Sequence, residues 1–234
     1  MSDSFFHFKG FSLKNQSAAF RINTDGVLLG VWADLLIDQT IIDIGTGTGV
    51  IAHICHYRNR NAEVVAIDID QDSCNEANYN VVHNDIGSHI RVEQVDVKDH
   101  ICNEGYDHIL SNPPYYSGST LPKDKKLQLS KHSIHLSISK FWRAVSRLSH
   151  QQSKVSIIIP YNDLKAHYQE AAIYGWKISR MTEVSNTETS PPTRALVEFK
   201  KFDAEKTISQ LHIYDQCGIK YSKSFIELHK DFYL

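Results

Sequence analysis

The stretch Asp43-Ile44-Gly45-Thr46-Gly47-Thr48-Gly49 decides the fold class of this 234-residue chain. It follows a short apolar run at 40–44, typical of a buried strand, and precedes an apolar-periodic run at 50–57, typical of a helix. Glycines at such a turn let the backbone approach a ligand closely and bring helix N-terminal amides to it. The stretch therefore predicts a strand, a binding turn and a helix in succession.

The rest of the chain alternates strands and helices in the same way. Further strands are expected at 63–67, 89–95, 106–110, 155–159, 176–184 and 193–200, the last two as an antiparallel hairpin. Helices are expected at 25–36 (with Thr24 or Asp25 as N-cap), 70–83, 137–148 and 164–174, and the tail at 211–234 suggests a strand and a short helix. The pattern predicts an α/β fold, a seven-stranded and mainly parallel sheet with helices on both faces.

The composition favours one globular domain without a membrane segment. Hydrophobic residues make up 41% of the chain, no apolar run reaches about 18 residues, and the N-terminus lacks the pattern of a secretory signal. The cysteines Cys55, Cys74, Cys102 and Cys217 are isolated from one another. We interpret them as reduced thiols and expect a cytoplasmic protein.

Positive charge is concentrated in one block of the sequence, residues 121–154. The block holds eight Lys and Arg and one Asp, so it carries 8 − 1 = +7, and the remainder of the chain carries −2 − 7 = −9. Such a block beside a candidate site loop could attract a polyanion. An ordinary solvated surface is the alternative.

Polar residues stand at the ends of four expected strands: Asp43, Asp68, Asp96 and Asn112. Ligands of parallel α/β sheets bind at the carboxyl ends of the strands, near the switch in strand order. If the four strands are neighbours, these side chains line one crevice.

The glycine turn and the next acid together indicate a nucleoside cofactor. The spacing is G-x-G-x-G with an acid before it, whereas dinucleotide sites use G-x-G-x-x-G, and an acid there would repel a pyrophosphate. It would suit an ammonium or sulfonium group. Asp68 follows Asp43 by 68 − 43 = 25 positions, where a carboxylate can accept both ribose hydroxyls. The combination predicts S-adenosylmethionine, with Asp96 accepting from the adenine amine. A plain tight turn and a solvated strand-end Asp are the alternatives.

The motif Ser111-Asn112-Pro113-Pro114-Tyr115-Tyr116 suits transfer to a planar amine. An exocyclic amine such as adenine N6 is a poor nucleophile, and two acceptors aimed at its hydrogens would stabilise the positive charge that develops on it. Asn112 offers a side-chain oxygen, Pro113 offers a carbonyl on a rigid backbone, and Tyr115 can stack on the base. A proline turn that only ends the strand is the alternative.

These motifs resemble those of the class I S-adenosylmethionine-dependent methyltransferases. More narrowly, the opening segment at 6–34, the late PPTRALVEF at 191–199 and the closing YSKSFIELHKDFYL at 221–234 resemble the bacterial tRNA1(Val) adenine-N6 methyltransferases. The resemblance implies a Rossmann-like fold and methylation of adenosine 37 in the anticodon loop of tRNA-Val. It assigns the catalytic site to Asn112, Pro113, Pro114 and Tyr115. It assigns cofactor binding to Asp43, Gly45, Gly47, Gly49, Asp68, Asp96 and Asn112, and to Thr24 and Asp25, with Arg21, in a covering segment.

On this basis residues 1–234 form one domain, with a cover segment at 1–39, a core at 40–200 and a C-terminal strand and helix at 201–234. We expect a monomer or weak dimer that binds tRNA, with no membrane contact. His53, Cys55 and His56 offer no third oriented metal ligand, so no metal is expected. Residues 130–133 depart from the family pattern, because Ser133 stands where an acid is usual.

Three other interpretations stay open at this point. NPPY-type methyltransferases also act on rRNA, DNA adenine or protein glutamine, although glutamine enzymes usually carry a helical domain before the core. A non-catalytic RNA-binding protein could keep the same fold. A nicotinamide dehydrogenase is disfavoured by the spacing of the glycines.

Overall fold

The computed structural model describes residues 4–19, 21–36, 39–113, 136–202 and 205–233. In this part of the chain the strands are β1 (Phe5–His7), β2 (Ser12–Lys14), β3 (Thr40–Ile44), β4 (Glu63–Asp68), β5 (Ile90–Gln94), β6 (Tyr106–Ser111), β7 (Ser149–Pro160), β8 (Lys177–Ser185), β9 (Pro192–Lys200) and β10 (Thr207–His212). The helices are α1 (Thr24–Trp32), α2 (Val50–Arg58), α3 (Gln71–His83), α5 (Ile138–Arg147), α6 (Leu164–Ile173) and α7 (Lys223–His229), with a 3-10 turn at Tyr161–Asp163.

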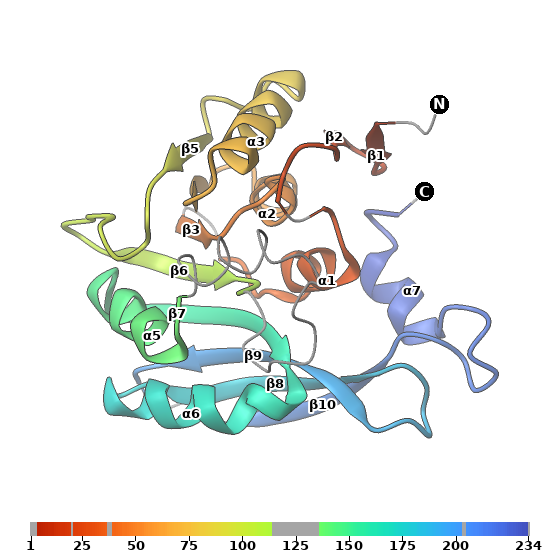
Figure 1. Cartoon of the computed structure of the whole chain (residues 1–234). Coiled ribbons are helices and arrows are strands. Elements are labelled where there is room, and N and C mark those ends of the chain that lie inside the picture. Colours follow the sequence, from red (N-terminus) through yellow and green to blue (C-terminus); the bar gives the residue numbers. More distant parts are fainter. Residues whose placement is uncertain (1–3, 20, 37–38, 114–135, 203–204, 234) are drawn as a thin grey trace, which may run out of the picture.

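One sheet organises the described chain, with the strand order β10-β8-β9-β7-β6-β3-β4-β5 (Figure 1). Strands β5, β4, β3, β6 and β7 are parallel, and β9 is antiparallel to both β7 and β8. The predicted α/β architecture and the late antiparallel hairpin are confirmed. All seven expected strands are present, and the tail strand β10 adds an eighth by pairing in parallel with the edge of β8.

Helices cover both faces of this sheet because strand residues alternate between two apolar clusters. Ile41 and Leu110 face a cluster built with α1, α2 and α7, whereas their neighbours Ile42 and Ile109 face a cluster built with α5 and α6. Side chains of successive strand residues point to opposite faces, so a strand buried on both sides must be apolar at almost every position. Trp142 and Trp176 are buried in the second cluster, in agreement with the prediction that they are core residues.

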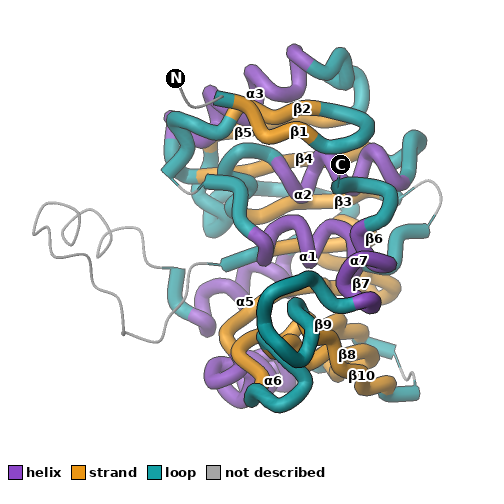
Figure 2. The backbone as a smooth tube through the Cα atoms, turned by 90° about the vertical axis from the view of Figure 1, so that its right-hand side faces the viewer, coloured by secondary structure: helices purple, strands orange, loops and turns teal. Residues whose placement is uncertain are grey.

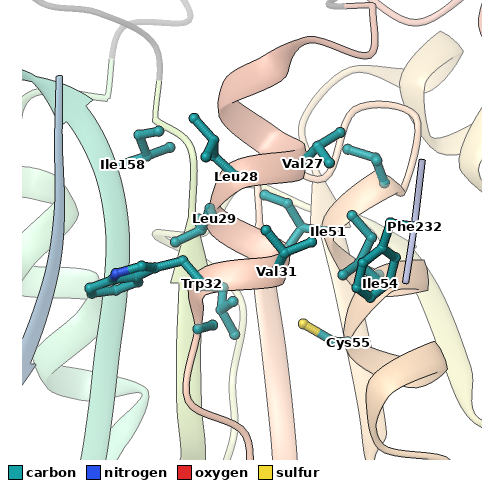
Figure 3. Close-up of a cluster of buried hydrophobic side chains, with 14 of the residues drawn as sticks. Val27, Leu28, Leu29, Val31, Trp32, Ile51, Ile54, Cys55, Ile158 and Phe232 are labelled. Carbon is teal, nitrogen blue, oxygen red and sulfur yellow. The ribbon is translucent and has the colours of Figure 1, made fainter. Parts of the chain in front are cut away.

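Helix α1 packs closely on α2 through small residues and aliphatic side chains (Figure 3). Its N-cap is Asn23, whose side chain accepts from the Gly26 amide, so the prediction of Thr24 or Asp25 as N-cap is wrong. The helix also ends earlier than predicted, at Trp32, because Ala33 has an extended backbone and the Arg58 guanidinium binds the carbonyls of Gly30 and Ala33. Asn, Thr and Asp are all good N-caps, so composition does not separate them.

The N-terminal segment forms a small hairpin of β1 and β2, which periodicity did not predict. Figure 2 shows this hairpin lying along α3. Its strands have three residues each, too short for an alternation pattern to be recognised. The end of the chain reaches the same region, since the Lys9 amide donates to the Phe232 carbonyl at 2.9 Å.

The basic block divides into structural and exposed residues. The Arg147 guanidinium donates to the carbonyls of Val97 and His100 and so holds the loop before β6. Lys154 is 4% exposed and pairs with Asp34, with 3.1 Å between Nζ and Oδ2. These two cations therefore serve the fold, which reduces the part of the block available to a polyanion. Lys123, Lys125, Lys126 and Lys131 lie outside the described residues.

Within the described ranges, no helix has both the length and the apolarity needed to cross a membrane.

Candidate active site

The carboxyl ends of four neighbouring strands form the candidate site. Because β6, β3, β4 and β5 are adjacent and parallel, the residues that follow them meet at one edge of the sheet. Asp68 ends β4, and Asn112, the glycine turn after Ile44 and Asp96 follow the other three strands. The condition for the predicted crevice, that the four strands are neighbours, is thus met.

The glycine turn leaves β3 and is fastened to the end of β4. The amides of Gly45 and Thr46 both donate to the Ile67 carbonyl, at 2.9 and 3.0 Å. Gly45, Gly47 and Gly49 have φ values of 75°, 56° and 84°, in the left-handed region that side chains disfavour. Glycine is therefore needed at each of these positions for the backbone path alone. Gly49 is the N-cap of α2, so the turn ends where that helix begins.

Asp43 lies beneath this turn and is fully buried, with 0% exposure. Thr46 Oγ1 donates to its Oδ2 at 2.6 Å. Burial raises the pKa of Asp43 to about 7, against the lowering effect of hydrogen bonds from Thr46 and the Ala52 amide. From the sequence, Asp43 is predicted to contact the cofactor directly. Its burial and the hydrogen bond that it accepts from Thr46 show that it braces the glycine turn from below.

Asp68 stands at the end of β4 and orients the turn from the side. Its Oδ2 accepts from the Gly47 amide at 2.9 Å and its Oδ1 from the Asp70 amide at 3.0 Å. Burial raises the pKa of this carboxyl. A carboxylate has about four acceptor positions. With backbone amides using part of them, Asp68 keeps acceptor positions that ribose hydroxyls could use.

The space above the turn fits a ligand that approaches the backbone. A Cβ atom built on Gly45 would meet no heavy atom within 4 Å, and Gly45 is exposed. An open face over a glycine turn, next to a carboxylate with unused acceptor positions, suits a nucleoside better than a phosphate. Gly45, Gly47 and Asp68 thus fit the predicted cofactor, whereas Asp43 and Gly49 are buried and support the turn.

Asp96 lies two residues beyond β5 and is engaged locally. The Lys98 amide donates to Oδ1 at 2.9 Å, and Lys98 Nζ lies 2.8 Å from Oδ2. Its side chain is 20% exposed. The predicted contact with the adenine amine would use the remaining acceptor positions of this carboxylate.

Asn112 leaves the sheet beside Gly45. Ser111 is the register partner of Ile44, and Ser111 Oγ donates to the Ile44 carbonyl at 2.8 Å. The residue after each, Asn112 and Gly45, therefore stands on adjacent strand ends. Asn112 is partly exposed, and Pro113 is buried. Pro114 and Tyr115, the other predicted catalytic residues, lie outside the described residues.

The residues predicted to cover the cofactor lie at the start of α1. Asp25 is buried, at 4% exposure, and forms an ion pair with Arg194 of β9, with 2.6 Å between Oδ1 and Nε. Arg194 is the register partner of Pro160, at the carboxyl end of β7, so the pair lies at the same edge of the sheet as the glycine turn. Thr24 and Arg21 are exposed.

Comparisons with known proteins agree with this geometry. The family model described as methyltransferase small domain matches residues 25–135. The tRNA1(Val) (adenine(37)-N6)-methyltransferase of Phocaeicola vulgatus is 34% identical over 234 residues, which cover 100% of this chain and 99% of that protein. The protein of the same name from Parabacteroides distasonis is 33% identical over 236 residues, covering 100% and 99%. The chain belongs to this family.

Solved structures place the methyltransferase in the same fold. A predicted O-methyltransferase of Agrobacterium tumefaciens superposes with a TM-score of 0.69 at 18% identity, over 89% of this chain and 96% of that one. A methyltransferase of Pyrococcus furiosus gives a TM-score of 0.59 at 17% identity, over 82% and 90%. Identities this low bear on the fold alone.

Sequence reasoning missed several residues that support the site of this methyltransferase. Arg194 stands in the PPTRALVEF segment that carried the resemblance, but nothing there indicated its partner Asp25. Thr46 and Ser111 were interpreted only as members of motifs. Glu76 and Asn80 on α3 have buried polar side chains, with 3% and 0% exposure. The signal available in the sequence was a Glu and an Asn four positions apart in the predicted helix at 70–83.

The histidines and cysteine of α2 do not face a common ligand. His53 Nδ1 lies 2.7 Å from the Gly49 carbonyl, and His56 stacks on His89 with 4.8 Å between ring centroids. Burial lowers the pKa of His53, and it lowers that of His56 to about 4. No group of three metal-binding side chains is found among the residues that the structure describes.

Proposed function

We propose that this methyltransferase transfers the methyl group of S-adenosylmethionine to N6 of adenosine 37 in the anticodon loop of tRNA1(Val). The observation that carries the proposal is the adjacency of Asn112 and Gly45 on neighbouring strand ends, in a chain that matches tRNA1(Val) (adenine(37)-N6)-methyltransferases over its whole length. This adjacency brings an amine-binding motif next to a cofactor turn.

The residues divide into two groups with different tasks. Asp68 and the glycine turn hold the nucleoside part of the cofactor, and Asp96 accepts from its adenine amine. When bound, the cofactor supplies an electrophilic methyl on a sulfonium. Asn112 Oδ1 and the Pro113 carbonyl accept the two hydrogens of the adenine N6 amine and stabilise the charge that develops there. Tyr115, next to Pro114, stacks on the base.

This mechanism relies on positioning and charge stabilisation. Aligning the amine with the methyl removes most of the entropy cost of a bimolecular step. Because the target base must leave its stack, the site suits a nucleotide of a loop. An anticodon loop presents such a base without the cost of opening a duplex.

We further propose that residues 1–234 act as one domain, as a monomer or weak dimer, in the cytoplasm. The four cysteines are free, and Cys55 and Cys74 are buried, which suits a reducing compartment.

The test is methyl transfer from labelled S-adenosylmethionine to unmodified tRNA1(Val) transcript, with nucleoside analysis of the product. We expect N6-methyladenosine at position 37 and a single-turnover rate about 10²–10³-fold lower for Asn112→Ala. Calorimetry on the same variant measures its cofactor affinity separately, because Asn112 is expected at both the amine and the cofactor. A wild-type protein that binds the cofactor and methylates rRNA or DNA instead would overturn the assignment of the substrate.

A further inference from the structure

Helix α3 carries a row of polar side chains that face the N-terminal segment. The row is Ser73, Glu76, Asn80 and Asn84, spaced by three, four and four residues, so it lies on one face of the helix. All four side chains bind the backbone of residues 12–19. Ser73, Glu76 and Asn80 are at most 3% exposed. The segment is therefore held along α3 by hydrogen bonds to its backbone (Figure 2).

The two elements match in length along this contact. Asn84 bonds both the amide and the carbonyl of Ser12, and Asn80 bonds both the amide and the carbonyl of Lys14. Two residues of a strand advance about 6.6 Å and four residues of a helix about 6 Å. The segment can thus run antiparallel to α3, from its C-terminal end toward its N-terminal end, without losing register.

Glu76 makes the most concentrated contact of the row. Its carboxylate accepts from the amides of three successive residues, Gln16 at 2.8 Å, Ala18 at 3.1 Å and Ser17 between them. Successive amides that converge on one anion form a nest, and here the anion is a side chain of the same protein. Such bonds depend on the charge of the acceptor.

The contact continues directly into the candidate site. The amide of Ala19 donates to Ser73 Oγ in the first turn of α3, which begins shortly after Asp68 at the end of β4. Asn80 also donates to the carbonyl of Thr48 in the glycine turn, at 2.9 Å. On the other side, a Cβ on Gly26 in the first turn of α1 would lie 3.1 Å from Val50, the first residue of α2. Residues 21–24 thus lie along the carboxyl edge of the sheet, between Ala19, which is held by α3, and Gly26, which packs against α2.

We propose that Glu76 and Asn80 are positioning residues for the cofactor: by holding residues 12–19 on α3, they keep the chain at 21–24 over the crevice and so increase the affinity for S-adenosylmethionine. The inference deepens the proposed function and rests on it only through the cofactor. Neither side chain touches the reacting atoms.

The first test uses the wild-type protein and no RNA. If docking of residues 12–19 on α3 increases the affinity for the cofactor, bound cofactor must stabilise the docked segment by the same factor. Hydrogen exchange of the amides at 16–18 should therefore slow when S-adenosylmethionine is added at saturation. Exchange rates that do not change would overturn the inference.

The second test compares Glu76→Gln with Asn84→Ala as a matched control. Both variants lose bonds to the same segment, but Asn84 holds its outer end at Ser12, away from the crevice. If the Glu76→Gln substitution reduces the docked fraction to about a tenth, the apparent Kd for the cofactor rises about tenfold. The control should stay within about twofold, and single-turnover transfer at saturating cofactor should fall much less than affinity.

Two outcomes separate this inference from its alternatives. Equal cofactor affinity in both variants and the wild type would mean that the row serves stability alone. If Glu76→Gln does not fold, the exchange measurement on the wild type still decides. A protein that passes both tests but leaves tRNA unmethylated would overturn the proposed substrate and leave the positioning role intact.

Discussion

At the scale of single residues, the site depends on carboxylates with different surroundings. Asp43 is enclosed under the glycine turn, Asp68 accepts from two backbone amides at its side, and Asp96 pairs with Lys98 near solvent. Three acids at neighbouring strand ends thus have three roles. The surroundings, and not the residue type, decide which one braces the fold and which one can meet a ligand.

Asp68 is expected to bind the cofactor, so Asp68→Ala should raise the Kd for S-adenosylmethionine at least tenfold. The reason is the loss of hydrogen bonds to a charged acceptor, worth about 1.5–3 kcal/mol each. Calorimetry without RNA measures this. Asp72→Ala removes an exposed acid from the first turn of α3 and should leave the Kd unchanged. Equal affinities of the two variants would remove Asp68 from the cofactor site.

Asp43 should make stability depend on pH in a defined direction. Its pKa is about 7 in the folded protein and 3.8 in the reference state, so the folded state holds the proton more tightly between these values. That contribution to stability is complete below the lower value and is lost as pH rises through about 7.

Asp43→Asn should remove this dependence while keeping an acceptor for Thr46. Between roughly pH 5 and pH 8, the variant should gain about 2–3 kcal/mol relative to the wild type. Urea denaturation of both proteins at the two pH values measures the difference. Parallel pH dependence in the two proteins would show that Asp43 does not titrate in this range.

At the scale of elements, the contact between α1 and α2 sets the path of the chain over the site. A Cβ on Gly30 would lie 3.0 Å from Ile54 Cβ, an atom that no rotamer change can move. Helix α1 can therefore approach α2 closely only with glycine at this position. The close approach also fixes Asn23 and Asp25 at the carboxyl edge, where α1 begins.

Gly30→Ala should consequently destabilise the protein by up to about 2 kcal/mol. Overpacking costs about 1–3 kcal/mol, and the better helix propensity of alanine offsets about 1 kcal/mol. The free energy of unfolding from urea titration gives the value. Gly87→Ala is the control, since its Cβ would lie 3.8 Å from its nearest neighbour, and it should stay within about 0.5 kcal/mol. A stabilised Gly30→Ala would show that α1 and α2 can separate freely.

At the scale of the whole molecule, positive charge is concentrated in residues 121–154, and the rest of the chain is acidic. Two of the basic residues at 121–154, Arg147 and Lys154, are engaged in the fold, whereas Lys140 and Arg143 are exposed on α5. If the block binds RNA, we expect its other cations, which include Lys125, Lys126 and Lys131, to make the contacts.

Replacing Lys125, Lys126 and Lys131 with Gln should weaken tRNA binding and lower its salt dependence. Each phosphate contact contributes about 0.7–0.9 to the slope of log affinity against log salt, so the slope should fall by about 2. Cofactor affinity should not change. The control replaces Lys206, Lys220 and Lys223, which are exposed and carry the same total charge. If the two triple variants lower the slope equally, the block has no special role.

Much of this protein was determined by its sequence alone, for reasons that are local. Apolar runs of four to six residues followed by polar ends specify strands, and a buried strand needs apolar residues on both faces, which Thr40–Ile44 and Tyr106–Ser111 provide. The glycine turn needs left-handed backbone at three positions, and glycine is the residue that adopts it freely. The strands, the glycine turn and the positions of Asp68 and Asn112 at strand ends could all be recognised in this way.

Only the tertiary structure decided which distant residues meet. The ion pair of Asp25 with Arg194, the enclosure of Asp43 and the bonds from α3 to residues 12–19 join parts of the chain that no local pattern connects. β10 likewise joined the sheet because an open strand edge lay beside it. Periodicity reports which face of an element is buried, but the partner on that face is chosen by packing of the whole chain.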